Sequence, residues 1–233
     1  MSVWYTICLY LARFVYWMLG GLKGVNEHNV PRSGPLIVAP NHVSLLDPPA
    51  VACGTNRHLR FMAKEELFRA KGFGWLIRSL GAFPVSRGEG DTEAIRTAIN
   101  AINKGDAVLI FPEGTRGDGK VIQPVNRGVT MLAKRTGAKV LPVGIIGTHL
   151  VWPKGQKKIK RGNIRIIYGV PFTYEEVATG SNERENREIF ALELQKRIAH
   201  LCNDNGMPVR IERSSERSKT CPSGQTSAEP PGS

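Results

Sequence analysis

The sequence lacks the patterns that mark several common classes of domain. Its four cysteines among 233 residues are widely separated, with no Cys-x-x-Cys pair, which argues against a disulfide framework, a zinc ribbon and a redox motif. A Gly-x-x-x-x-Gly-Lys-Ser/Thr loop for nucleotide phosphates is missing. No basic residues precede the first apolar run, so a signal peptide fits poorly. We therefore expect a reducing, cytosolic compartment, with no metal site and no bound cofactor.

Acidic residues are in short supply. The chain has 20 Asp and Glu against 32 Lys and Arg, a formal net charge of +12. Such a field attracts anionic partners, which include nucleic acid, acidic lipid headgroups and phosphorylated small molecules. The chain has no RNA-recognition, zinc-finger or helix-turn-helix signature, and its aromatic, apolar N-terminus is a poor nucleic-acid-binding arm. We predict no nucleic-acid partner.

The N-terminal stretch is the longest apolar run of the chain. Residues 3–22 read VWYTICLYLARFVYWMLGGL, about the length that crosses a bilayer, but Arg13 lies in the middle, where a charge costs about 2.5–3.5 kcal/mol. Its tryptophans and tyrosines suit the headgroup boundary. Three interpretations remain open: an interfacial helix, a transmembrane anchor and a buried core helix. We predict that residues 1–24 are a membrane-associating helical segment.

Beyond residue 24, short apolar runs alternate with helical patterns. Runs typical of buried strands are Leu36–Ala39, Leu59–Ala63, Ala107–Phe111, Lys139–Ile146 and Asn163–Tyr168. Helical patterns cover residues 64–80, 91–104 and 126–136, and a last helix carries the stripe Phe190, Leu194, Ile198 and Leu201. The alternation predicts an α/β domain over residues 25–212, with a mixed, largely buried central sheet flanked by helices. Residues 213–233 have the composition of a disordered tail.

Two of the strand patterns run into unusual polar segments. The first continues into Asn41-His42-Val43-Ser44-Leu45-Leu46-Asp47. Histidine is the side chain best suited to act as a general base near neutral pH, and a carboxylate on its other ring nitrogen orients it. On an ideal helix His42 and Asp47 would lie about 140° apart, so they meet only across a turn. Alone, the segment fits equally well a strand-to-helix turn capped by Asp47.

The second polar segment is Phe111-Pro112-Glu113-Gly114-Thr115-Arg116. Its glycine permits a tight turn and close approach of a ligand. Arg116 offers a planar fork that suits phosphate oxygens, and Thr115 adds a hydroxyl donor. In isolation, the same residues also describe a surface turn with Glu113 and Arg116 paired in solvent.

Together the segments resemble the glycerophospholipid acyltransferase family, and most closely its bacterial-type 1-acyl-sn-glycerol-3-phosphate acyltransferases. His42-x-x-x-x-Asp47 matches the first motif of this family and Phe111–Arg116 the third. Gly81–Arg87 is similar to the second motif and Leu141–Ile145 to the fourth, in the same order. Pro84 departs from the pattern, because an aromatic residue often stands there.

The resemblance implies transfer of an acyl group from acyl-CoA or acyl-carrier protein to the sn-2 hydroxyl of lysophosphatidic acid, forming phosphatidic acid. His42 would be the base and Asp47 its partner, with no covalent nucleophile. The implied substrate-binding residues are Lys64, Arg87, Glu113, Gly114, Thr115 and Arg116, with Asn41 and Ser44 in supporting roles. Glu113 is expected to orient Arg116 or to accept a glycerol hydroxyl. Alternatives are another acceptor, such as glycerol 3-phosphate or another lysolipid, and a non-catalytic peripheral lipid-binding protein.

The densest basic stretch runs from Lys154 to Arg165. It is compatible with a solvated loop, with attraction to anionic lipids, and with docking of an acidic acyl-carrier protein. Membrane lipids are the expected partner. The expected location is the cytoplasmic face of the cell membrane, with the protein monotopic or anchored by its N-terminus.

Overall fold

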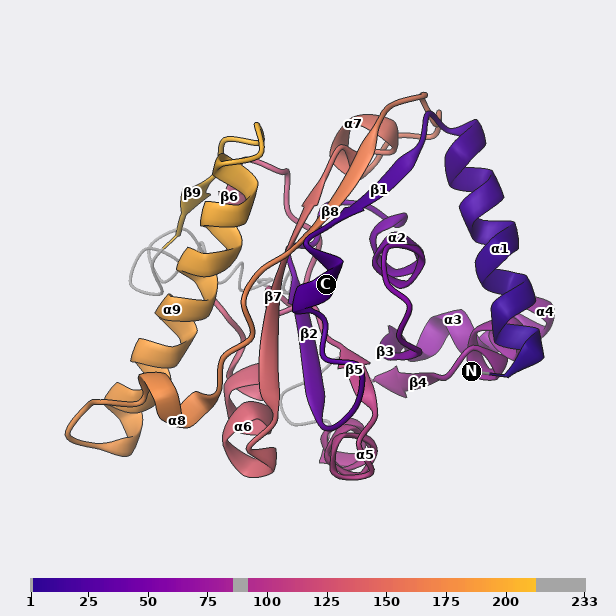
Figure 1. Ribbon diagram of the computed structural model, residues 1–233. Coiled ribbons are helices and arrows are strands. Elements are labelled where there is room, and N and C mark those ends of the chain that lie inside the picture. The colour runs from indigo at the N-terminus through magenta and orange to yellow at the C-terminus, as the bar shows by residue number, and fades with distance from the viewer. Residues whose placement is uncertain (1, 86–91, 213–233) are drawn as a thin grey trace, which may run out of the picture.

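A seven-stranded mixed sheet forms the centre of the computed structural model, which describes residues 2–85 and 92–212 (Figure 1). The strand order is β1-β8-β7-β2-β5-β3-β4. All neighbouring strands are parallel except β7 and β8, which run antiparallel. The seven strands are β1 (Leu22–Val25), β2 (Leu36–Pro40), β3 (Leu59–Lys64), β4 (Ala82–Val85), β5 (Ala107–Leu109), β7 (Lys139–Ile146) and β8 (Ile164–Tyr168). A separate pair joins β6 (Val121–Ile122) to β9 (Arg210–Ile211).

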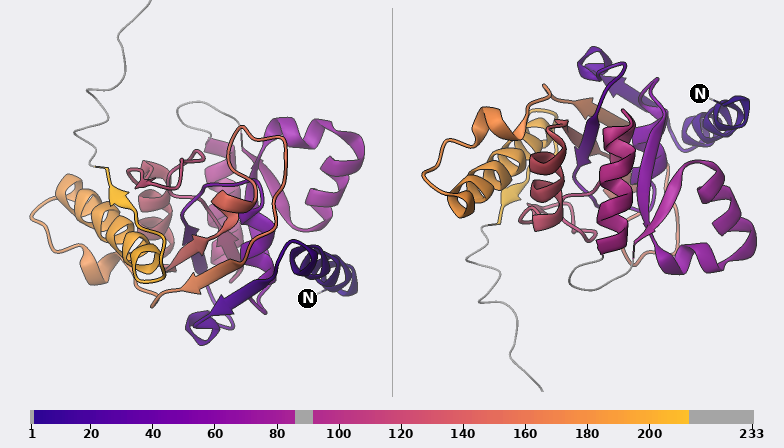
Figure 2. Two further views of the ribbon diagram at one scale, coloured as in Figure 1. Left: turned by 90° about the horizontal axis from the view of Figure 1, so that it is seen from above. Right: turned by 90° about the horizontal axis from the view of Figure 1, so that it is seen from below.

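Helices cover both faces of the sheet (Figure 2). On one face α5 (Thr92–Asn103), α6 (Arg127–Thr136) and α9 (Glu183–Asn203) bury side chains such as Ile102, Leu132 and Phe190. On the other face α1 (Val3–Met18) and α2 (Asp47–Cys53) cover a second cluster. The shorter helices are η1 (Glu27–Asn29), α3 (Glu65–Arg69), α4 (Lys71–Ser79), α7 (Thr148–Val151) and α8 (Tyr174–Val177). The predicted α/β class with a mixed central sheet is confirmed.

Most predicted elements lie close to their expected bounds. Strand β7 coincides with the predicted run, and α6 begins one residue after Asn126, whose side chain caps it by accepting from the Gly128 N–H. Strand β5 is shorter than expected, because it ends at Leu109. The helical pattern over residues 64–80 divides at Ala70 into α3 and α4. In the stripe of α9, Cys202 is buried and Leu201 only partly so.

Helix α1 lies against α2 and exposes an apolar outer face (Figure 1). Tyr5 and Tyr16 point inward, and the Tyr16 hydroxyl donates to the Leu46 carbonyl at 2.6 Å. Arg13 turns toward the protein and donates to the Cys53 carbonyl at 3.0 Å, which explains how a charge is accommodated in this apolar segment. Within the described residues, no helix has the length and apolar character needed to cross a membrane.

The strand β1 crosses the boundary expected between the segment 1–24 and the acyltransferase domain. Leu22 pairs with Ile164, and Val25 with Ile167, so these residues form an edge of the central sheet. The predicted tail of residues 213–233 lies outside the described residues, as do Asp91, the expected cap of α5, and Arg87.

Candidate active site

The polar segments lie where the parallel strands of the sheet end. Strands β2, β5, β3, β4 and β7 run in the same direction, so the residues that follow them share one edge. Open α/β sheets usually bind ligands at this edge. The His42 turn follows β2 and the Glu113–Arg116 turn follows β5. A hydrogen bond of 2.7 Å from the Gly117 N–H to the His42 carbonyl joins the two turns.

His42 and Asp47 form a hydrogen-bonded pair. The His42 Nδ1 lies 2.8 Å from Asp47 Oδ2. The His42 side chain is 17% exposed and that of Asp47 is fully buried. The ring of Phe111 stacks on the imidazole, with 3.8 Å between centroids. The remaining ring nitrogen, Nε2, is therefore the atom of this pair that can exchange a proton with a substrate.

The turn itself holds the carboxylate of Asp47. The backbone N–H groups of Val43 and Ser44 both donate to Asp47 Oδ2 at 2.7 Å. Asp47 is also the first residue of α2, followed by Pro48 and Pro49 in its first turn, where proline suits the unbonded N–H positions. The sequence left a choice between a turn capped by Asp47 and a His/Asp pair. The structure contains the pair, whereas the cap position of α2 belongs to Leu46 and the Asp47 side chain bonds to the preceding turn instead of capping the helix.

Glu113 contacts the backbone of the His42 turn. Its Oε1 accepts the His42 N–H at 2.8 Å and its Oε2 accepts the Gln123 N–H at 3.1 Å, and the residue is 3% exposed. Burial raises the pKa of Glu113 to about 7, although the two N–H donors oppose the rise. The expected pairing with Arg116 or with a glycerol hydroxyl differs from this geometry, in which both carboxylate oxygens bond to the protein backbone.

Gly114 and Thr115 are the exposed residues of the Phe111–Arg116 segment, and Arg116 is partly exposed. Gly114 has a φ of 70°, which favours glycine. The Arg116 carbonyl accepts from Lys154 Nζ at 3.0 Å. Within the described residues, the Arg116 guanidinium forms no hydrogen bond or ion pair. Its donors are therefore available to an anionic ligand at the same turn as the His42–Asp47 pair.

The supporting residues connect the His42 turn to the segment that follows β7. The Asn41 side chain accepts the Ile145 N–H at 2.7 Å and donates to the Ile145 carbonyl at 3.1 Å. These two hydrogen bonds place the Asn41 amide between β2 and β7. The Ser44 hydroxyl donates to the Trp152 carbonyl at 2.7 Å and accepts the Leu46 N–H.

Two further predicted residues belong to the neighbouring strands. Lys64 is exposed at the end of β3 and pairs in register with Val85 of β4. Arg87 follows β4 and lies outside the described residues. Among the described residues, no group of three or more His, Cys, Asp or Glu side chains is arranged to hold a metal ion.

Sequence reasoning missed the contacts that depend on distant backbone atoms. Gln123 supplies an N–H to Glu113, and Phe111 supplies the ring on which His42 stacks. Phe111 directly precedes the Pro112-Glu113-Gly114 turn, so its position in the third segment was an available signal. Nothing in the sequence identifies Gln123.

Comparison with known proteins agrees with this geometry. Residues 22–146 match the acyltransferase family. A 1-acyl-sn-glycerol-3-phosphate acyltransferase of Bacillus subtilis is 30% identical over 168 residues, 72% of this chain and 81% of the relative. A lyso-ornithine lipid O-acyltransferase of Pseudomonas aeruginosa is 31% identical, over 57% of this chain and 53% of the relative.

A solved structure has the same fold. The crystal structure of the 1-acyl-sn-glycerophosphate acyltransferase PlsC of Thermotoga maritima superposes with a TM-score of 0.71 at 30% identity. The match covers 87% of this chain and 80% of the PlsC chain. The extent of the family match, the identity and the shared fold agree: this chain belongs to the acyltransferase family.

Proposed function

We propose that the protein transfers an acyl group from acyl-CoA or acyl-carrier protein to the sn-2 hydroxyl of 1-acyl-glycerol-3-phosphate, forming phosphatidic acid. The observation that carries this proposal is the hydrogen-bonded pair of the partly exposed His42 and the buried Asp47, beside the Arg116 turn. The B. subtilis relative and the PlsC structure, both named for this acceptor, support the choice of substrate.

The reaction needs a base, and it proceeds without an acyl-enzyme intermediate. His42 Nε2 takes the proton of the acceptor hydroxyl while the oxygen of that hydroxyl attacks the carbonyl carbon of the thioester. Asp47 on Nδ1 stabilises the imidazolium that forms. The tetrahedral intermediate then collapses, the C–S bond breaks, and the departing thiolate receives the proton from His42. The products are the ester and the free thiol, and the imidazole returns to its starting state.

Recognition of the phosphate is assigned to the basic residues at the same edge of the sheet. Arg116 is the first candidate, because its guanidinium has unengaged donors and suits a phosphate bidentately. Thr115 and the exposed backbone at Gly114 adjoin it, and Lys64 and Arg87 follow the next two strands. Holding the phosphate fixes the position of the hydroxyl relative to His42, which is a large part of the catalytic gain.

Substitution of His42 tests the proposal. General-base catalysis contributes about 10²–10⁴-fold, so His42→Ala should lose at least about 100-fold in acylation of lysophosphatidic acid, measured with a radiolabelled acyl thioester. The matched control is His200→Ala, since His200 lies exposed on α9. Activity of His42→Ala equal to that of the control would refute the role of His42. Glycerol 3-phosphate and lyso-ornithine lipid serve as competing acceptors, and a strong preference for either would replace the proposed substrate.

Substitution of Arg116 tests the recognition of phosphate. Hydrogen bonds to charged groups contribute about 1.5–3 kcal/mol, so Arg116→Ala should lower kcat/KM for lysophosphatidic acid by about 10–100-fold. Acylation of a monoacylglycerol, which has no phosphate, should change little. Arg135→Ala on the exposed side of α6 is the control. Equal losses for both acceptors would remove Arg116 from the phosphate site.

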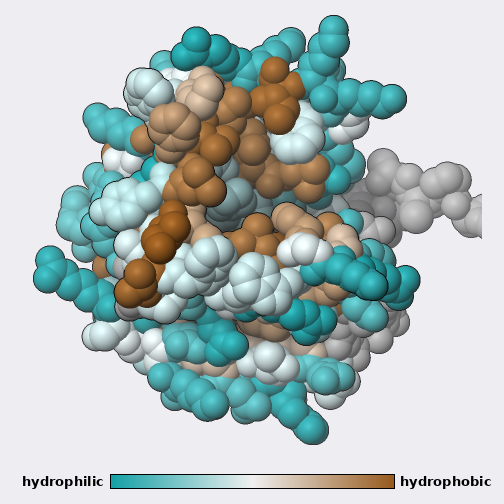
Figure 3. Space-filling view, turned by 90° about the vertical axis from the view of Figure 1, so that its right-hand side faces the viewer, coloured by the Kyte–Doolittle hydropathy of each residue, from teal (hydrophilic) through white to brown (hydrophobic). Residues whose placement is uncertain are grey.

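The same proposal includes attachment to the membrane surface through α1. The outer face of this helix exposes large apolar side chains, among them Ile7, Tyr10, Leu11, Phe14 and Trp17 (Figure 3). Phe73 and Trp75 of α4 extend it, and the rings of Trp4 and Trp75 lie 5.7 Å apart. An exposed apolar patch of this kind marks a membrane or protein contact, and a lipid surface fits an enzyme acting on lysolipids.

A further inference from the structure

The second oxygen of the Asp47 carboxylate has no partner among the described residues. Asp47 Oδ2 accepts three hydrogen bonds, from His42 and from the N–H groups of Val43 and Ser44. Asp47 Oδ1 is buried and forms no hydrogen bond. Leaving a buried carboxylate oxygen without a donor is costly. A hydrogen-bond donor for Asp47 Oδ1 is therefore expected from the elements that pack against this turn.

The segment after β7 lies against this turn. The Ser44 hydroxyl donates to the Trp152 carbonyl, and Ser44 also pairs with Pro153 as an isolated β-bridge. Helix α7 directly precedes these residues and begins after Gly147, which has a φ of 94°. A Cβ at position 147 would lie 2.1 Å from the Asn163 carbonyl oxygen. Only glycine fits this turn, so the backbone that leads into Thr148 and His149 is fixed in place.

Thr148 and His149 carry buried polar atoms that also have no partner among the described residues. These atoms are the Thr148 Oγ1 and the His149 Nδ1, and Thr148 is fully buried. His149 lies next to Gly119, three residues after Arg116, because a Cβ on Gly119 would contact the His149 Cβ at 3.4 Å. Burial lowers the pKa of His149, and the nearby charge of Asp47 opposes this. A neutral imidazole carries one N–H, and a threonine hydroxyl is also a donor.

We propose that Thr148 and His149 donate hydrogen bonds to one water molecule that in turn donates to Asp47 Oδ1, and that both are positioning residues for the His42–Asp47 pair. The inference rests on the proposed function, in which this pair acts as the base. Donors on Oδ1 and Oδ2 together fix the plane of the carboxylate. The carboxylate then stays directed at His42 Nδ1 while the imidazole gains and loses a proton.

Three substitutions of His149 separate hydrogen bonding from packing. The amide nitrogen of His149→Asn occupies about the position of Nδ1, and that of His149→Gln about the position of Nε2. His149→Leu fills space without a donor. Losing a hydrogen bond to a charged group corresponds to about a 10-fold loss or more. We expect His149→Leu and His149→Gln to lower kcat by about 10-fold with little change in KM, and His149→Asn to recover most of it.

Thr148 has its own matched pair. Thr148→Val keeps the shape and removes the hydroxyl, whereas Thr148→Ser keeps the hydroxyl. Thr148→Val should lower kcat and Thr148→Ser should not. The combination of Thr148→Val with His149→Leu should lose less than the product of the single losses, because both residues act on one oxygen.

A readout independent of turnover distinguishes this inference from the proposed function. The proton between His42 Nδ1 and Asp47 gives an imidazole N–H resonance that can be followed by NMR. His149→Leu should shift or broaden it, and should move the acid limb of the profile of kcat/KM against pH. An unperturbed resonance in His149→Leu, or equal losses in the Asn and Leu variants, would overturn the positioning role. Failure of the wild-type protein to acylate any lysolipid would refute the proposed function, but the resonance would still test the contact.

Discussion

At the scale of single residues, one carboxylate oxygen organises the turn that carries the proposed base, His42. Asp47 Oδ2 collects two backbone N–H groups of its own turn and the Nδ1 of His42, all within 2.8 Å. The Asp47 carboxylate thus both orients His42 and stabilises the turn that brings the two residues together. Loss of the Asp47 carboxylate would leave two buried N–H groups unpaired in addition to releasing His42.

This local arrangement explains which site residues the sequence made visible. His42 and Asp47 meet within a six-residue turn, so the sequence could suggest their pairing, and the ordered motifs that follow favoured it over a capped turn. Glu113 bonds to a backbone N–H 71 positions away along the chain, and its type alone could not distinguish a backbone contact from a substrate contact. The partner of Asn41 could not be identified for the same reason, because Ile145 lies on a neighbouring strand.

The buried carboxyl of Glu113 predicts a pH dependence of stability. Its pKa is raised by burial from 4.5 to about 7, and the charges of Asp47 and Asp118 add to the rise. The folded state therefore holds the proton more tightly than the unfolded state. The resulting stability is complete below pH 4.5 and is lost as the pH rises through 7, up to roughly 3 kcal/mol. Cys202, with a pKa raised by burial to about 12, stays neutral throughout.

Urea unfolding at pH 5 and pH 8 measures this contribution. The difference in the free energy of unfolding between the two pH values should shrink in Glu113→Gln, which cannot titrate. Glu175→Gln on the exposed surface of α8 is the control and should behave as the wild type. If Glu113→Gln retains the full pH difference, the titration belongs to another group.

At the scale of elements, the sheet was predictable where strands are buried and was missed at its edge. Strands β2 and β7 are continuous apolar runs because helices cover both faces. Strand β1 is a short edge strand whose partner β8 lies about 140 positions later, and its four residues show no clear alternation. Its membership in the sheet follows from tertiary pairing, which a local pattern does not contain.

The Arg57 side chain joins the loops that precede β2 and β5. We therefore expect its loss to lower the free energy of unfolding. The Arg57 guanidinium donates to the carbonyls of Pro31, Ser33, Gly34 and Gly105. Arg57→Ala removes all four bonds and should lower the free energy of unfolding by about 2–4 kcal/mol, measured by urea denaturation. Arg57→Lys should lose less, because an ammonium keeps some of these bonds.

The control for Arg57 is an exposed arginine that forms an ion pair. Arg184→Ala on α9 removes an i,i+4 contact with Glu188 between two largely exposed side chains, which contributes about 0.5 kcal/mol at most. A loss for Arg57→Ala no larger than that of the control would show that the two loops do not depend on the bridge.

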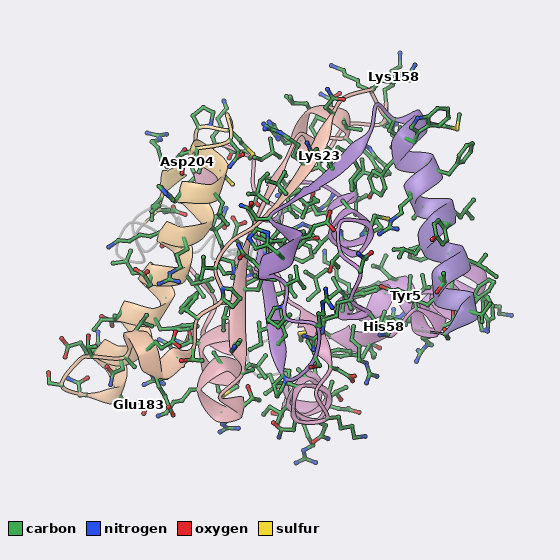
Figure 4. The ribbon with its side chains drawn as sticks, viewed as in Figure 1. Tyr5, Lys23, His58, Lys158, Glu183 and Asp204 are labelled. Carbon is green, nitrogen blue, oxygen red and sulfur yellow. The ribbon has the colours of Figure 1, made fainter. Side chains whose placement is uncertain are left out.

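At the scale of the whole molecule, the apolar and basic features expected separately from the sequence lie at one side. The Gly162 N–H donates to the Leu19 carbonyl at 2.7 Å, which joins the basic segment to the end of α1. Figure 4 places Lys158 at the same end of the molecule, while Tyr5 and His58 hold the other end of α1 to the protein. The two features together fit the surface of an anionic bilayer.

Vesicle binding separates the two contributions. Leu11→Asp with Phe14→Asp places charges on the outer face of α1 and should abolish binding to vesicles with and without phosphatidylglycerol. Val170→Asp, also at an exposed apolar position, should not. Replacing Lys157, Lys158 and Lys160 by Gln should weaken binding only to phosphatidylglycerol vesicles, by about 100-fold at about 1 kcal/mol per lysine.

A matched change of charge elsewhere controls for the net field of the protein. Replacing the exposed Lys104, Lys139 and Lys196 by Gln removes the same charge at positions outside α1 and the basic segment, and it should leave most of the vesicle affinity intact. High salt should reduce the wild-type affinity for phosphatidylglycerol vesicles toward that of the Lys157, Lys158 and Lys160 variant, because the Debye length falls from about 10 Å at 0.1 M to about 3 Å at 1 M ionic strength. If that variant binds vesicles as the wild type does but loses activity only with acyl-carrier protein, the basic loop is a docking site for the carrier. Its place beside α1 would then serve delivery of the donor, while α1 alone holds the enzyme on the lipid surface.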